Sequence, residues 1–149
     1  MAEAIALSTK GISKKGGPFG CIIVKGEKIV GSGYNKVTLN CDPTAHAEII
    51  AIRDACANLG TFQLEDCEVY SSCEPCPMCM GAIYWARPKV VYYANSRQDA
   101  ASIGFDDSFI YEELNSKLTE RKIPFISLKM DNAVTVFKDW KEMENKIAY

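Results

Sequence analysis

Residues 67–94 have the sequence CEVYSSCEPCPMCMGAIYWARPKVVYYA and encode three successive elements. Residues 67–71 predict a short strand, residues 77–85 a helix, and residues 89–94 a second strand rich in β-branched and aromatic side chains. Pro77 suits the first turn of the helix, where its missing N–H would have no partner anyway. A strand, a helix and a strand in this order favour a parallel pair of strands joined by a helical crossover.

The chain before this unit predicts a hairpin. Residues 21–25 and 28–34 are β-rich, and the two residues between them form a link of the length that closes a hairpin. Gly31 and Gly33 weaken the second strand, and they indicate either a bulge or a place where another group approaches the backbone.

Helical patterns stand on both sides of the hairpin. Residues 1–13 have few helix breakers and predict a short first helix. The sequence Asp42-Pro43-Thr44 predicts the start of a longer helix, which Gly60 ends. Its apolar residues recur at helical spacing: Ile49, Ile52, Ala55, Cys56 and Leu59.

The remainder of the chain completes an α/β pattern. Residues 125–130 form a possible strand, and a last helix has the apolar residues Val134, Phe137, Trp140, Met143 and Ile147. Taken together, the elements predict a three-layer α/β/α sandwich around a mixed five-stranded sheet. Ligands of such sheets bind outside the carboxyl ends of the strands, where the following helices begin.

Length and composition indicate a single domain spanning residues 1–149. A chain of 149 residues with 48% hydrophobic residues builds a core without disulfides or a partner. The formal net charge of −2 gives no field that would concentrate polyanions, so we expect no nucleic-acid partner. No segment approaches the length of a membrane span and no signal peptide is recognisable, so we expect no membrane contact and a cytoplasmic location with reduced thiols.

Two clusters of potential metal ligands stand at the starts of two predicted helices. They are Thr44-Ala45-His46-Ala47-Glu48 and Cys73-Glu74-Pro75-Cys76-Pro77-Met78-Cys79. Cys76 and Cys79 are three residues apart and share one side of a first helical turn, and His46 joins them if the two helix ends converge. One histidine and two thiolates leave the fourth position of a zinc ion open for water, as in catalytic sites. We therefore predict a catalytic Zn²⁺ held by these three residues.

Glu48 is the candidate catalytic residue. It follows His46 by two residues, so its carboxylate can lie beside the metal at the helix end. There it could take a proton from water and hand it to a leaving nitrogen of the substrate. H-x-E followed by P-C-x-x-C is the signature of zinc deaminases, and residues 46–48 and 75–79 carry it.

A closed structural zinc site is the alternative from another class of protein. With Cys73 as a fourth ligand, the chain would be a zinc-stabilised module without turnover. Pro75, however, biases Glu74 toward an extended conformation, which carries Cys73 away from the helical pair. The catalytic interpretation is therefore favoured.

Four motifs resemble the cytidine deaminase superfamily. They are Pro18-Phe19-Gly20, Asp42-Pro43-Thr44-Ala45-His46-Ala47-Glu48, Ser72-Cys73-Glu74-Pro75-Cys76-Pro77-Met78-Cys79 and Gly81-Ala82-Ile83-Tyr84-Trp85-Ala86-Arg87-Pro88. With residues 104–111 and Tyr149, the resemblance narrows to bacterial-type guanine deaminases and covers nearly the whole chain. It implies a cytidine-deaminase-like fold and one Zn²⁺ per subunit. It also implies hydrolytic deamination of guanine to xanthine and ammonia by zinc-activated water, in purine catabolism or salvage.

The resemblance also implies which residues hold the purine. These are Phe19, Asn35, the backbone at Ala47, Trp85, Asp107 and Tyr149. Asp107 has an independent physical argument, because a carboxylate accepts hydrogen bonds from the ring N1–H and the exocyclic amine of guanine, whereas N1 of adenine is itself an acceptor. A homodimer is implied as well, with the C-terminal segment completing the site of the neighbouring subunit.

Deaminases of the same fold with other substrates remain alternatives. They act on guanosine, on cytosine or cytidine, on another amino-heterocycle, or on the wobble adenosine of tRNA. The last of these needs phosphate contacts, and the acidic charge balance argues against it. Ammonia release from a panel of these compounds distinguishes them.

Overall fold

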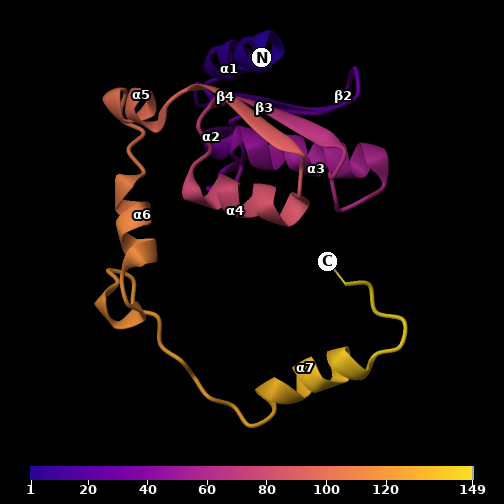
Figure 1. Cartoon of the computed structure of the whole chain (residues 1–149). Coiled ribbons are helices and arrows are strands. Elements are labelled where there is room, and N and C mark those ends of the chain that lie inside the picture. Colours follow the sequence, from indigo (N-terminus) through magenta and orange to yellow (C-terminus); the bar gives the residue numbers. More distant parts are fainter. Residues whose placement is uncertain (149) are drawn as a thin grey trace. The chain divides into compact units, whose positions relative to one another are not determined.

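The computed structural model describes residues 1–148, which contain a mixed sheet of four strands (Figure 1). The strands are β1 (Gly20–Lys25), β2 (Lys28–Tyr34), β3 (Cys67–Cys73) and β4 (Val90–Asn95), in the order β2-β1-β3-β4. β1 pairs antiparallel with β2 and with β3, whereas β3 and β4 are parallel. The predicted hairpin and the predicted parallel pair are both confirmed.

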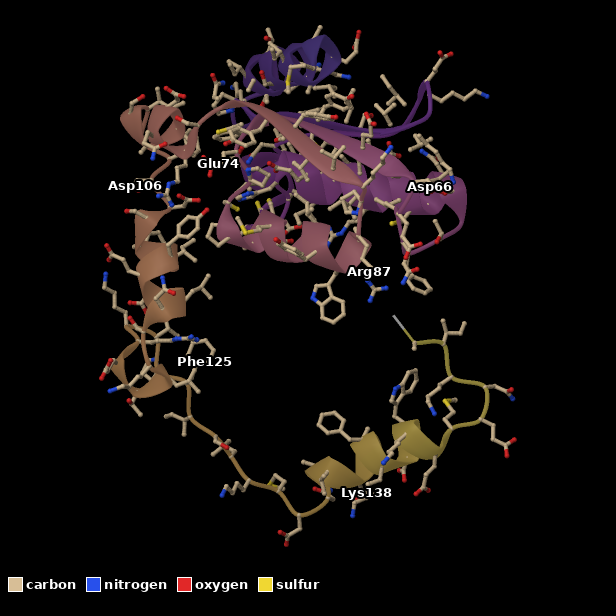
Figure 2. All side chains as sticks on the ribbon, in the orientation of Figure 1. Asp66, Glu74, Arg87, Asp106, Phe125 and Lys138 are labelled. Atoms are coloured by element: carbon tan, nitrogen blue, oxygen red, sulfur yellow. The ribbon has the colours of Figure 1, made fainter. Side chains whose placement is uncertain are left out.

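Helices cover both faces of the sheet (Figure 1). α1 (Ala2–Ser13) packs on one face against β1, and α3 (Ala47–Leu59) and α4 (Pro77–Ala86) cover the other. α3 ends at Gly60 in a left-handed conformation, and α4 ends in the same way at Arg87, which Figure 2 labels. These layers agree with the α/β/α architecture that the sequence predicts.

The core lies between the sheet and α3. Ile23 of β1, Val69 of β3 and Leu64 are almost completely buried there. The two glycines of β2 let α3 approach closely, because a Cβ added at Gly33 would lie 2.4 Å from the carbonyl oxygen of Ala47, and one at Gly31 would lie 2.4 Å from that of Ala51. The close backbone approach is thus confirmed, and it positions the start of α3. The predicted bulge is confirmed as well, since Ile23 pairs with Gly31 but Val24 pairs with Ile29, which shifts the register beside Gly31.

Short helices connect and follow these elements. They are α2 (Val37–Asn40), α5 (Arg97–Ser102), α6 (Ser108–Asn115), the 3₁₀ turn η1 (Leu118–Glu120) and α7 (Ala133–Glu142). The chain divides into two compact units, Met1–Phe109 and the part from Ile110 onward. The sheet belongs wholly to the first unit, and the prediction of a single domain stays a prediction.

The predicted fifth strand is wrong for this chain. Within residues 1–148 the sheet has four strands, and residues 125–130 belong to no helix or strand. Their side chains suit a strand, but a strand also requires a neighbouring backbone to pair with. Phe125, Ile126 and Leu128 are instead 59%, 78% and 83% exposed.

Among residues 1–148, every helix is too short or too polar to cross a lipid bilayer. The cytoplasmic location stays a prediction.

Candidate active site

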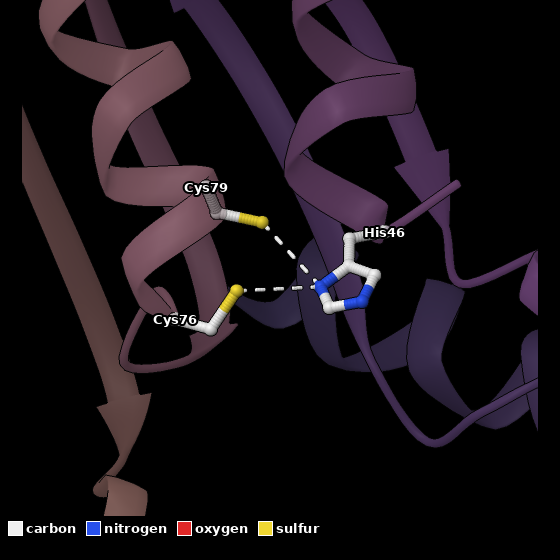
Figure 3. A group of neighbouring side chains, drawn as sticks. All are labelled: His46, Cys76 and Cys79. Atoms are coloured by element: carbon white, nitrogen blue, oxygen red, sulfur yellow. Dashed lines mark hydrogen bonds between the residues drawn. The ribbon is translucent and has the colours of Figure 1, made fainter. Parts of the chain in front are cut away.

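The site is built on the first residues of two neighbouring helices. His46 directly precedes α3 and Cys76 directly precedes α4, each with an extended backbone. Neither side chain caps its own helix, so both are free to project beyond the helix end. α3 and α4 pack against each other, which brings the two starts together as the sequence predicts (Figure 3).

Three metal-ligating side chains converge at this point. Nδ1 of His46 lies 3.5 Å from Sγ of Cys76 and 3.5 Å from Sγ of Cys79 (Figure 3). The ligand atoms of the three residues all lie within 4.8 Å of one another. Zinc bonds of about 2.0 Å to nitrogen and about 2.3 Å to sulfur, at a tetrahedral angle, separate the two atoms by about 3.5 Å. The donor set therefore fits a zinc ion.

Cys73 lies outside this cluster. Among the described residues, only His46, Cys76 and Cys79 form a group of this kind. The Cys73 thiol donates to the carbonyl oxygen of Ser96 at 3.5 Å, and burial raises its pKa to about 11. A neutral thiol engaged elsewhere supplies no fourth ligand, so this geometry supports an open site rather than a closed structural one.

The cluster favours the charged form of one thiol. Hydrogen bonding from Cys79, and then from His46, lowers the pKa of Cys76 to about 4 against the opposing effect of burial. The same contact with Cys76 raises the pKa of His46. Since the thiolate is the form that binds a metal, Cys76 is prepared for ligation.

Glu48 lies beside the cluster in the first turn of α3 and is 5% exposed. Its Oε1 accepts a hydrogen bond from the Ser71 hydroxyl at 2.9 Å, and its Oε2 lies 3.4 Å from Sγ of Cys79. Burial raises the pKa of the Glu48 carboxyl, whereas the hydrogen bonds from Ser71 and Cys79 oppose that rise. A raised pKa brings the protonated and the ionised form of the carboxyl closer in free energy at neutral pH, which suits both the uptake and the return of a proton.

Three of the predicted purine contacts, Phe19, Asn35 and Ala47, lie on segments that hydrogen bonds join to the start of α3. Ala47 is completely buried next to His46, and Asn35 is 6% exposed. The Asn35 side-chain oxygen accepts from the N–H of Val37 at 3.2 Å, and the next residue, Lys36, donates its N–H to the carbonyl oxygen of Ala45 at 2.9 Å. These bonds tie the segment carrying Asn35 to the segment carrying His46. The Asn35 N–H donates to the carbonyl oxygen of Phe19 at 3.0 Å, which joins Phe19 to the segment carrying Asn35.

Phe105 is a residue of this region that the sequence interpretation missed. Its ring packs edge-on against Phe19, with centroids 5.0 Å apart and an angle of 88° between the planes. Only its position two residues before Asp107 could have suggested it. Burial and the negative charge of Cys76 raise the pKa of the Asp107 carboxyl, so this carboxyl lies within electrostatic reach of the cluster.

One predicted purine contact, Trp85, is not brought to the cluster. Trp85 is 65% exposed, in the last turn of α4, about 13 Å along the helix from Cys76 at about 1.5 Å per residue. Tyr149 lies outside the described residues. Both remain predictions from the sequence.

Comparisons with known proteins match this geometry. The sequence model described as the cytidine and deoxycytidylate deaminase zinc-binding region matches residues 1–95. A guanine deaminase from Bacillus subtilis (strain 168) is 51% identical over 150 residues, which cover 100% of this chain and 96% of that protein. A tRNA-specific adenosine deaminase from Aquifex aeolicus is 32% identical over 132 residues, which cover 87% of this chain and 84% of that one.

A solved structure resembles the whole chain. The X-ray structure of guanine deaminase from Bacillus subtilis superposes with a TM-score of 0.97 at 52% identity. The match covers 99% of this chain and 95% of that one, so it includes the residues from Ile110 onward as well as the sheet.

Proposed function

The chain belongs to the cytidine and deoxycytidylate deaminase zinc-binding family, and from this premise we propose that it catalyses the hydrolytic deamination of guanine to xanthine and ammonia. The observation that carries the proposal is the convergence of His46, Cys76 and Cys79 beside the buried carboxylate of Glu48. The similarity over the full chain to a guanine deaminase supports the choice of base.

His46, Cys76 and Cys79 would hold one zinc ion per subunit. When bound, zinc acts as a Lewis acid that lowers the pKa of a water molecule and so makes it a nucleophile at neutral pH. Two thiolates and a neutral imidazole balance the charge of the ion, and a neutral base can approach such a site without repulsion.

Glu48 moves the protons of the reaction. Its carboxylate takes a proton from the attacking water, whose oxygen bonds to C2 of guanine, and returns a proton to the exocyclic nitrogen. The bond between C2 and that nitrogen then breaks, ammonia leaves, and the water oxygen remains on xanthine. The position of Glu48 Oε2 next to the metal-ligating Cys79 supports this role.

Asp107 and the aromatic pair would select the base. The ring of Phe19, backed by Phe105, provides a flat apolar wall for a purine. Asp107 would accept hydrogen bonds from N1–H and from the amine of guanine, with Asn35 and the N–H of Ala47 as further contacts. Adenine would leave the carboxylate facing an acceptor, which costs several kcal/mol when the group is buried.

The test is a panel of substrates assayed for ammonia release together with the zinc content of the same preparation. Guanine is expected to be turned over far faster than guanosine, cytosine, cytidine or adenosine, with about one zinc per chain. Activity confined to another base would overturn the substrate assignment. A full complement of zinc with no turnover of any of these compounds would favour a structural role for the metal.

Adenosine of tRNA is the second candidate, because one relative of 32% identity is a tRNA-specific adenosine deaminase. The formal net charge of −2 argues against it, since tRNA binding depends on neutralising phosphates. Inosine formation in unmodified tRNA substrates would favour this candidate over guanine.

We also propose that the chain works as a homodimer in which the C-terminal segment of one subunit completes the site of the other. From Ile110 onward many apolar side chains are exposed, among them Ile123 at 74% and Phe137 at 75%. The first unit carries an apolar groove along α4 and β4, lined among others by Met80, Tyr84 and Tyr93. A second copy of the chain would cover such surfaces, which soluble monomers rarely leave in water.

The mass in solution tests the dimer. Sedimentation equilibrium is expected to give twice the chain mass of 16.5 kDa. A monomeric mass at the concentrations where guanine is turned over would overturn the proposal.

A further inference from the structure

The carboxylate of Glu48 is held from the sheet side by a buried hydroxyl. Ser71 lies near the end of β3, and its Oγ–H donates to Oε1 of Glu48 at 2.9 Å. Ser71 is 1% exposed and Glu48 is 5% exposed, so water does not compete freely for this contact. The other carboxylate oxygen, Oε2, lies 3.4 Å from Sγ of Cys79. The two oxygens therefore face two different elements, β3 and α4.

This arrangement restricts how the carboxylate can turn. The last torsion of a glutamate side chain has a broad, two-fold preference, so the group does not by itself keep one oxygen in one place. A hydrogen bond to a charged acceptor is stronger than one between neutral groups. The bond from Ser71 to Oε1 thus keeps Oε2 directed toward the three metal-ligating residues.

We propose that Ser71 is a positioning residue, whose hydroxyl holds Glu48 Oε2 toward the cluster of His46, Cys76 and Cys79. This inference rests on the proposed function, in which Glu48 transfers the protons. Ser71 has one hydroxyl donor, and Glu48 Oε1 accepts it. Its hydroxyl therefore acts on turnover through Glu48, and leaves the binding of zinc and of guanine to other groups.

Ser72 is a matched control on the same strand. It is 2% exposed, and its Oγ accepts the N–H of Gly20 at 2.9 Å. Neighbouring residues of a strand point to opposite faces of the sheet, so the Ser72 hydroxyl lies on the face away from Glu48. Ser72→Ala removes one buried hydrogen bond of similar length, as Ser71→Ala does, but leaves the Glu48 contact in place.

Ser71→Ala is expected to lower kcat for guanine by about 10- to 100-fold, because small displacements of a catalytic group cost rates of that order. KM should change by no more than about twofold, since the lost contact serves turnover and not substrate binding. Zinc content is expected to stay at one per chain. Ser72→Ala is expected to leave kcat within about threefold of the unmodified chain.

A second pair of variants separates the hydroxyl from the shape of the side chain. Threonine and valine have nearly the same volume, but only threonine carries a hydroxyl. Ser71→Thr is expected to retain kcat within about threefold of the unmodified chain, whereas Ser71→Val is expected to lose as much kcat as Ser71→Ala does. This difference is expected even if the bulkier side chain lowers the stability of both Ser71→Thr and Ser71→Val.

Glu48→Ala separates failure of this inference from failure of the proposed function. If Glu48→Ala keeps its zinc and near-normal turnover of guanine, the proton-transfer role of Glu48 in the proposed function is wrong. If Glu48→Ala abolishes turnover, two results would overturn the positioning role of Ser71 alone. One is an equal kcat for Ser71→Ala and Ser72→Ala, and the other is an equal kcat for Ser71→Val and Ser71→Thr.

Discussion

In the proposed function, Asp107 is the residue that selects the base. Replacing it by asparagine keeps the size of the side chain but turns one acceptor into a donor. For Asp107→Asn we expect kcat/KM for guanine to fall by about 10- to 100-fold, the effect of losing about 1.5–3 kcal/mol in a hydrogen bond to a charged group. The measurement is steady-state kinetics with guanine and adenine as competing bases.

The acidity of Asp107 gives this prediction a second observable. Because burial raises its pKa, the carboxyl becomes neutral at a higher pH than a free aspartate does. The neutral carboxyl carries a proton, so it can donate a hydrogen bond where the N–H groups of guanine require an acceptor. The acid limb of kcat/KM for guanine should therefore include a decline that Asp107→Asn lacks. Identical profiles for the two proteins would show that Asp107 does not contact the base.

Cys73 distinguishes an open metal site from a closed one. Its thiol donates to Ser96 and stands apart from the cluster, so Cys73→Ser is expected to retain one zinc per chain. Metal analysis by mass spectrometry after exhaustive dialysis provides the measurement. Loss of the zinc in this variant, with Cys41→Ser at an exposed position as the control, would favour the closed structural site.

Among individual residues, the sequence predicted the proposed metal ligands better than the side chains that pack around the site. The spacing places His46 at the start of one helix and Cys76 and Cys79 at the start of the next, and the structure brings the three side chains together. Ser71 and Phe105 were missed, because each meets its partner only through tertiary packing over more than twenty residues of sequence. No local pattern marks a residue of that kind.

The close packing of α3 on β2 is the element-scale feature that positions the site. A methyl group at Gly33 would lie 2.4 Å from the backbone oxygen of Ala47, the residue between His46 and Glu48. Gly33→Ala is therefore expected to lower the free energy of unfolding by about 1–3 kcal/mol, as overpacking does, and to weaken zinc binding. Urea denaturation and competition with a chromogenic chelator measure the two effects.

Gly81 is the control for this substitution. It lies in α4, and a Cβ there would meet nothing within 4 Å. Gly81→Ala is expected to raise stability by about 0.5–1 kcal/mol, because alanine favours a helix over glycine. If Gly33→Ala behaves in the same way, the packing of α3 does not depend on that glycine.

The sequence predicted the four strands, α1, α3 and α4 of the first unit because each has its own local signal, whereas it did not predict the short helices α2 and α5. The β-rich composition and the two-residue link indicated the hairpin, and the Pro77 position and the helical spacing indicated α4 and α3. Residues 125–130 have the same kind of signal for a strand, but pairing is a property of two segments and cannot be read from one. The end of β3 also depends on its partner strand. The sequence predicted that the strand ends at residue 71, but β3 continues to Cys73, which pairs with Asn95 of β4.

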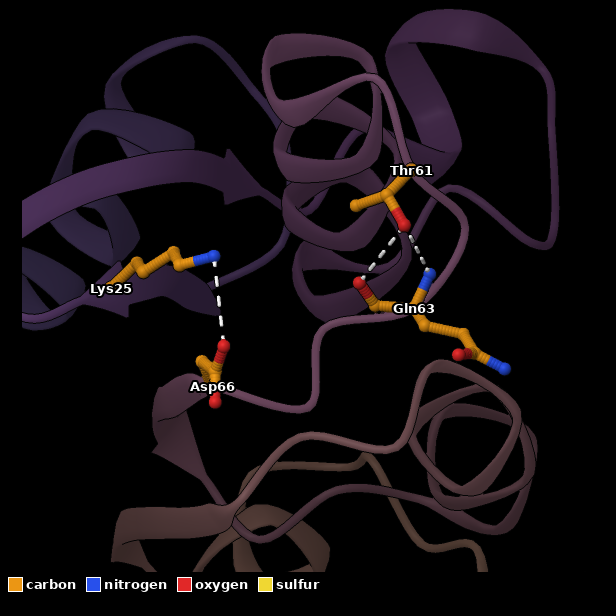
Figure 4. A network of polar contacts seen from close by, with 4 residues as sticks. All are labelled: Lys25, Thr61, Gln63 and Asp66. Atoms are coloured by element: carbon orange, nitrogen blue, oxygen red, sulfur yellow. Dashed lines mark hydrogen bonds and ion pairs between the residues drawn. The ribbon is translucent and has the colours of Figure 1, made fainter.

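The exposed polar contacts of the connection from α3 to β3 carry little of the stability. Thr61 exchanges hydrogen bonds with the backbone of Gln63, and Lys25 forms an ion pair with Asp66 at 3.8 Å (Figure 4). The Asp66 side chain is 84% exposed, and exposed pairs of this kind contribute at most about 1 kcal/mol. The position of β3 therefore depends on its pairing with β1 and β4 rather than on these polar contacts.

At the scale of the whole molecule, exchange of the C-terminal segment predicts complementation between two impaired chains. Glu48→Ala lacks the proton-transferring group but keeps Tyr149, whereas Tyr149→Ala keeps Glu48 but lacks the proposed purine contact. When the two are unfolded and refolded together, a site with both groups forms only if the segment crosses between subunits. About a quarter of the unmodified activity is then expected from random pairing of the chains.

The control refolds each variant alone, which gives the activity that mixing must exceed. A mixture no more active than the average of its two components would show that Tyr149 serves its own subunit or none. If Tyr149→Ala alone matches the unmodified chain in kcat/KM for guanine, Tyr149 is not a purine contact.

Two of the proposed ligands, His46 and Cys76, lie directly before two helices, so a bound metal would also act as a crosslink. His46 and Cys76 are 30 residues apart in the chain, and an ion between them closes that stretch into a ring. Holding the ring shut reduces the freedom of the unfolded polypeptide, as a disulfide would. The zinc-free form should accordingly open more often and be cleaved faster by proteases. The steady-state abundance of this protein in a cell would then follow the supply of zinc, independently of any substrate.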